Sequence, residues 1–77
     1  MSNVNECVVI YTQEDMDVSK RSWLVASLEH YRGIVSAWFE HGDHHSLTIH
    51  FEREHFSHIT LIDTIKKHGY LGKILQD

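Results

Sequence analysis

The chain has 77 residues, which is enough for one domain and too short for two. Apolar residues make up 42% and charged residues 23%, the balance of an ordinary globular protein, and no apolar run approaches the roughly 20 residues that cross a bilayer. Seven basic and eleven acidic residues give a net charge of −4, with no basic cluster beyond Lys66-Lys67. We therefore expect neither a nucleic-acid partner nor membrane insertion. The first residues lack the features of a secretory signal, so we expect a small soluble cytoplasmic protein.

Histidine is unusually abundant and cysteine is rare in this chain. Eight histidines outnumber the seven lysines and arginines together, and their full protonation would carry the net charge from −4 to +4. Mild acid is therefore expected to change solubility and the choice of partner. Cys7 is the only cysteine, which excludes an intramolecular disulfide. Because Cys7 lies within an apolar run, we expect it to be a small core side chain.

The first predicted elements are a strand and a helix. Residues 6–12 form a short β-branched run that is apolar on both faces, which is typical of a central strand. A polar loop follows at 13–18, in which we expect Met16 to be exposed. Asp17 or Ser19 can cap the next helix. That helix has one apolar stripe at helical spacing: Leu24, Val25, Leu28 and Tyr31.

A β-hairpin is predicted after this helix, which Gly33 ends by taking a left-handed conformation. The hairpin turn is at residues 41–45. The strand after the turn alternates strictly between apolar residues (Leu47, Ile49 and Phe51) and polar residues (Ser46, Thr48, His50 and Glu52). This pattern predicts one buried face and one wetter face. Trp38 alternates with Ala37 and Phe39, so we expect it on the wetter face.

A second helix and a last strand complete the predicted fold. Ser57 can cap the helix, and Gly69 ends it. Its apolar stripe is Leu61, Ile62 and Ile65, and the last strand, at 70–76, has Leu71, Ile74 and Leu75 as its apolar positions. The order strand, helix, strand, strand, helix, strand predicts an α+β, ferredoxin-like βαββαβ sandwich. We expect a single domain over 1–77, with a four-stranded antiparallel sheet and two helices on one face.

Several residues at fixed offsets carry a family resemblance: Gly33-Ile34, the strand 47–52, Ser57, Leu61, Ile65 and Gly69-Tyr70. In these the chain resembles the heavy-metal-associated domain of copper chaperones, mercury-binding proteins and metal-transporting ATPases. The resemblance implies the same βαββαβ fold and a metal loop with the pattern Met-x-Cys-x-x-Cys. Here Asp17 and Lys20 stand where the two cysteines are expected, close to Met16. A carboxylate cannot replace a thiolate for Cu(I), and an ammonium repels cations, so no metal residues are carried over from the family.

The histidines suggest a different metal chemistry. The five residues of the predicted hairpin turn include three imidazoles and one carboxylate: His41, Asp43, His44 and His45. Such ligands suit a divalent transition metal, namely Zn, Ni, Cu(II) or Co, whereas the alternative is an ordinary solvated turn. His68 is a second candidate ligand, because the family fold would bring it towards Met16 and Asp17. The alternative for His68 is a helix C-cap. His55 and His58 are expected to be exposed residues at the start of the second helix.

Two functional hypotheses remain open, and neither is an enzyme, because the chain has no phosphate loop and no plausible pair of nucleophile and base. The first is a metal-binding, metal-handling module that uses His and Asp in place of Cys. The second is a metal-free module that binds a partner protein or forms a homodimer through its open sheet face and edge strands. The expected interaction face consists of Trp38, Glu40, Thr48 and His50.

Overall fold

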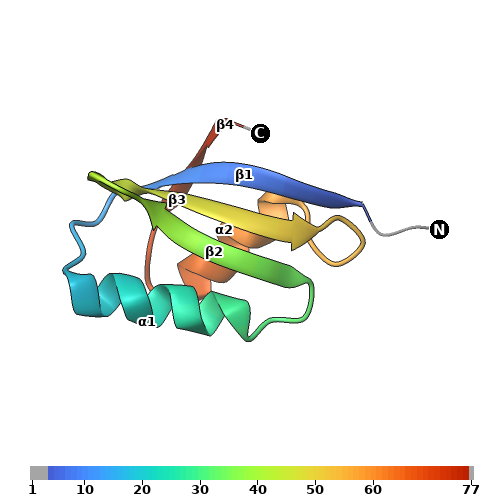
Figure 1. Ribbon diagram of the computed structural model, residues 1–77, viewed down its shortest axis with the longest axis horizontal. Helices are drawn as coiled ribbons and strands as arrows, with labels where there is room; N and C mark the ends of the chain where they lie inside the picture. The colour runs from blue at the N-terminus through green and yellow to red at the C-terminus, as the bar shows by residue number, and fades with distance from the viewer. Residues whose placement is uncertain (1–3, 77) are drawn as a thin grey trace.

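The computed structural model describes residues 4–76, and it confirms the predicted α+β, ferredoxin-like βαββαβ fold (Figure 1). The elements are β1 (Asn5–Thr12), α1 (Val18–Glu29), β2 (Ile34–Glu40), β3 (Asp43–Glu52), α2 (His58–Lys67) and β4 (Gly72–Gln76). The four strands form one antiparallel sheet in the order β2-β3-β1-β4. β1 is therefore a central strand, as predicted, and β2 and β4 are the two edges.

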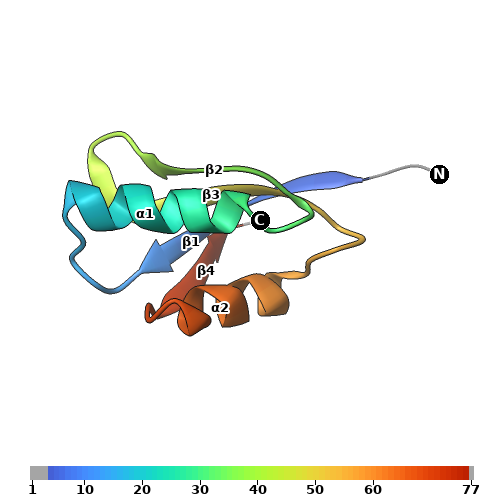
Figure 2. The same ribbon diagram turned by 90° about the horizontal axis from the view of Figure 1, so that it is seen from below.

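The core lies between one face of the sheet and both helices (Figure 2). Alternate strand residues point into it: Val8, Ile10, Ala37, Leu47, Ile49 and Phe51. The helices contribute Leu24, Leu28, Leu61 and Ile65 to the same cluster. Strand side chains alternate between the two faces, so the remaining strand residues point to the opposite face. No helix of residues 4–76 lies over that face. We call this opposite surface the helix-free face.

Two predicted burials are wrong. Met16 is only 2% exposed and belongs to the core cluster, because its flexible thioether packs under the start of α1 while Arg21 donates a hydrogen bond to the Met16 carbonyl. Cys7 is exposed, because the alternation of β1 sends Val8 and Ile10 into the core and Cys7 to the helix-free face.

Side-chain caps set the starts of both helices. Asp17 accepts a hydrogen bond from the Lys20 backbone N–H at 2.9 Å and begins α1. Ser57 begins α2 and forms a capping box with Thr60. α1 ends at Glu29, so Tyr31, which was predicted to continue the apolar stripe, lies beyond the helix. Gly33 has a φ of +101° in the turn into β2, which confirms its predicted left-handed conformation, but it does not end α1, whose C-cap is His30.

The last strand is shorter than predicted and begins at Gly72. Of its three predicted apolar positions only Ile74 packs against the core, whereas Leu71 and Leu75 are half exposed. Gly72 lies so close to β1 that a Cβ added to it would be 2.8 Å from the Ile10 side chain. No helix in residues 4–76 is both long and apolar enough to span a membrane.

Candidate functional site

The turn between β2 and β3 uses Asp43 as a structural residue. One carboxylate oxygen of Asp43 accepts a hydrogen bond from the His45 backbone N–H at 3.1 Å, and the other accepts one from the Ser46 hydroxyl at 2.7 Å. The Ser46 hydroxyl is the main cause of a lowered pKa at Asp43, and the His45 backbone N–H adds to it. Both oxygens that were predicted to bind a metal therefore hold the turn together.

His45 is likewise engaged with a neighbouring strand. Its Nδ1 lies 2.7 Å from the carbonyl oxygen of Thr12, which can only accept, so Nδ1 carries the proton. The Thr12 hydroxyl donates back to the His45 carbonyl, and the imidazole stacks on Tyr11 with ring centroids 5.2 Å apart. His41 and His44 are exposed at the tip. Within residues 4–76 no three His, Cys, Asp or Glu side chains are grouped so that they could hold a metal ion.

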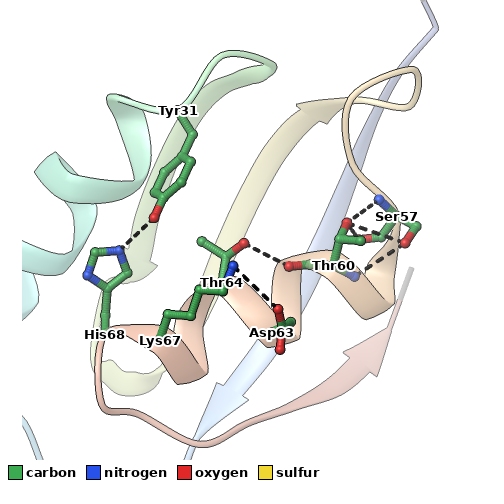
Figure 3. Close-up of polar contacts among 7 residues, drawn as sticks. All are labelled: Tyr31, Ser57, Thr60, Asp63, Thr64, Lys67 and His68. Atoms are coloured by element: carbon green, nitrogen blue, oxygen red, sulfur yellow. Dashed lines mark hydrogen bonds and ion pairs between the residues drawn. The ribbon is translucent and has the colours of Figure 1, made fainter.

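His68 contacts α1 and the turn that follows it. As the C-cap residue of α2, it places its Nε2 3.2 Å from the Tyr31 hydroxyl (Figure 3). The imidazole also meets Trp23 edge-on at 6.2 Å between ring centroids. These contacts differ from the predicted approach to Met16 and Asp17, and Met16 is buried.

His55 and His58, which lie near the start of α2, face different carboxylates. His55 lies 3.6 Å from a Glu52 oxygen, and His58 lies 3.4 Å from a Glu6 oxygen. The other Glu6 oxygen lies 3.3 Å from the Arg53 side chain. The two imidazoles are thus parts of separate polar contacts.

The predicted interaction face lies on the helix-free face, where Trp38 is its most prominent exposed side chain. Trp38 is 43% exposed and pairs with Thr48, which in turn pairs with Val9 of β1. Thr48 is only 6% exposed and donates a hydrogen bond to the Glu40 carboxylate at 2.7 Å. His50 is half-buried. Other exposed residues on this face include Tyr11, Leu75 and Cys7.

A groove that was not predicted lies beside β2, between that edge strand and α1. It has a volume of about 360 Å³. Its lining is Val18, Arg21, Ser22, Val25, Ala26, Glu29, Ala37, Trp38 and Phe39. Inside it, the Glu29 carboxylate accepts a hydrogen bond from the Ala37 backbone N–H at 3.1 Å. The signal in the sequence is the spacing of Val18, Ser22 and Ala26, which puts small and apolar residues on a second face of α1, with Glu29 at its end.

Compared with known proteins, the chain matches no protein-family model and has no significant match among curated proteins. The resemblance to the heavy-metal-associated domain therefore stays a prediction.

Proposed function

We propose that this chain is a metal-free protein-interaction module whose binding surface is centred on Trp38. One observation carries the proposal: a large aromatic side chain is 43% exposed on a sheet face that none of the helices in the described part of the chain covers. Exposed tryptophans are frequent anchors of protein interfaces, because burying one removes a large apolar area from water. Tyr11 and Leu75 extend the apolar surface on the same face.

The contacts of the histidines support this function better than metal handling. Both Asp43 oxygens already accept hydrogen bonds within the turn, and a metal would compete with those bonds. Asp17, which stands where the family resemblance implies a thiolate, caps α1 through the Lys20 N–H. A module that keeps the fold and has exchanged metal capture for protein binding is consistent with both observations.

The test compares the unmodified chain with Trp38→Ala and with a control, Trp23→Ala. Trp23 is also exposed, but it lies on α1. Sedimentation over a range of concentrations measures self-association, and capture from a lysate measures binding to other proteins. We expect Trp38→Ala to lose the association or the capture that Trp23→Ala retains. Equal behaviour of all three proteins in both assays would contradict the proposal.

A further inference from the structure

Resting on this interaction function, we propose that the partner is a second copy of the chain, paired antiparallel through the edge of β2. A twofold axis at Trp38 would relate the copies, and the two α1 helices would lie side by side beneath the joined sheet. Figure 1 shows the starting arrangement, with β2 at the outer edge and α1 running alongside it in the opposite direction. The groove between β2 and α1 of each copy is then covered by β2 and α1 of the other copy.

The outward hydrogen bonds of β2 indicate where the second strand binds. The Ala37 N–H donates to Glu29 of α1, so it points away from β3. Because backbone groups alternate in direction along an antiparallel strand, the N–H and C=O of Phe39 point the same way, and those of Trp38 point towards β3. The Glu29 carboxylate therefore stands where the carbonyl of a neighbouring strand would accept. A row of outward donors and acceptors on an edge strand is a template for another strand.

An axis at Trp38 gives a defined register. Ala37 of each copy pairs with Phe39 of the other through two backbone hydrogen bonds, and the two Trp38 residues face each other directly. In such a position Cα atoms lie about 4.5 Å apart, which brings the two indoles into contact on the helix-free face. The exposed aromatic surface of one copy is thus covered by the same surface of the other. Glu40 meets Ser36 of the second copy, so no like charges are opposed along the strands.

The charges of α1 are complementary under the same axis. Arg21 and Glu29 both line the groove, four positions on either side of Val25, and are about 12 Å apart along the helix. Antiparallel helices that meet at Val25 therefore place Arg21 of each copy opposite Glu29 of the other. Small side chains at Ser22 and Ala26 allow the helices to approach closely.

Dimerisation leaves the Ala37 N–H with a hydrogen-bond acceptor. When the second copy binds, this N–H exchanges the Glu29 carboxylate for a backbone carbonyl of the other strand. Glu29 is then released towards the guanidinium of Arg21 from the other copy. In the free chain this surface is open to water, and Val18 at the end of the groove is 66% exposed.

Sedimentation equilibrium of charge-reversed chains tests this geometry. We expect the unmodified chain to dimerise, and Arg21→Glu and Glu29→Arg to weaken the dimer by about tenfold or more each, because each places like charges together twice. An equimolar mixture of the two variants should recover the dimer, since each introduced charge then faces its opposite. Lys20→Glu is the matched control; Lys20 is exposed next to Arg21 but does not line the groove, so this variant should dimerise normally.

Three results would overturn the proposal: a monomeric unmodified chain up to millimolar concentration, charge-reversed chains that dimerise normally, or a mixture that stays monomeric. If Arg21→Glu fails to fold by circular dichroism, Ala26→Arg replaces it, because a long side chain there must block the approach of the helices. The dimer and the interaction function are contradicted by different results. A monomer whose capture of another protein depends on Trp38 would overturn the second copy as partner but retain the interaction module.

Discussion

Replacing Gly33 by alanine combines two energetic costs at one position. The φ of +101° is left-handed, which costs a residue with a Cβ about 1–2 kcal/mol. A Cβ added there would also overlap the Cβ of His55 and lie 2.8 Å from its Cγ. The Cβ of His55 cannot turn aside by rotation, because it is fixed to a backbone whose N–H bonds to the Glu52 carbonyl at 3.0 Å. Moving the turn after β3 adds about 1–3 kcal/mol, as in other overpacked sites.

The expected loss for Gly33→Ala is therefore roughly 2–5 kcal/mol, which lowers the midpoint of thermal unfolding by about 10 °C or more in a domain of this size. Gly42→Ala is the control, because Gly42 has a φ of +85° but has open space around its Cα. It should lose only the conformational part, about 1–2 kcal/mol. Urea unfolding followed by circular dichroism measures both values. Equal losses in the two variants would refute the steric reasoning.

Three further predictions concern caps, acidity and metal. Ser57→Ala should lose about 1 kcal/mol in urea unfolding, because Ser57 begins α2 through a capping box, and an unchanged midpoint would contradict that role. Ser46→Ala should raise the pKa of Asp43 towards its ordinary value of 3.8 in an NMR titration, since the Ser46 hydroxyl is the main cause of the lowered pKa. An unshifted Asp43 titration in Ser46→Ala would contradict this assignment. Because the pKa of Asp43 is lowered in the folded state, the stability that this carboxylate contributes is present at neutral pH. It is lost as the pH falls through the folded pKa, below 3.8. Zn(II) should perturb the NMR signals of the exposed His41 and His44 without saturation at micromolar metal, because two exposed imidazoles do not complete a tetrahedral site; a saturable site that includes other histidines would support metal handling instead.

Local signals made most of the fold predictable. The alternation of Leu47, Ile49 and Phe51 determines which face of β3 enters the core, and a strand pattern of period two depends on no distant residue. Ser46 and Thr48, predicted on the wetter face, are nevertheless buried at 6% exposure each. Ser57 acts within one turn of its own position, so the start of α2 was also predicted from neighbouring residues. The end of α1 was not, because the helix stops at Glu29, before Gly33. The order of these elements then leaves few topologies.

The burial and bonding of individual side chains depend on contacts that are distant in the sequence. His45 bonds to Thr12, which is 33 residues away, so the proximity of the histidines in the chain did not indicate what their rings contact. Met16 looks exposed among acidic neighbours, yet it is buried under α1. The groove beside β2 was missed because it depends on tertiary packing: Glu29 and Ala37, eight residues apart, are joined only after α1 folds back on the strand.

The fluorescence of Trp38 tests the proposed association surface most directly. Trp23→Phe leaves Trp38 as the only tryptophan, since the chain has two. If Trp38 is covered by a second copy, its emission should be blue-shifted at high protein concentration and should move reversibly to the red on dilution. Emission that stays at the wavelength of a solvent-exposed indole over the whole dilution series would contradict the dimer.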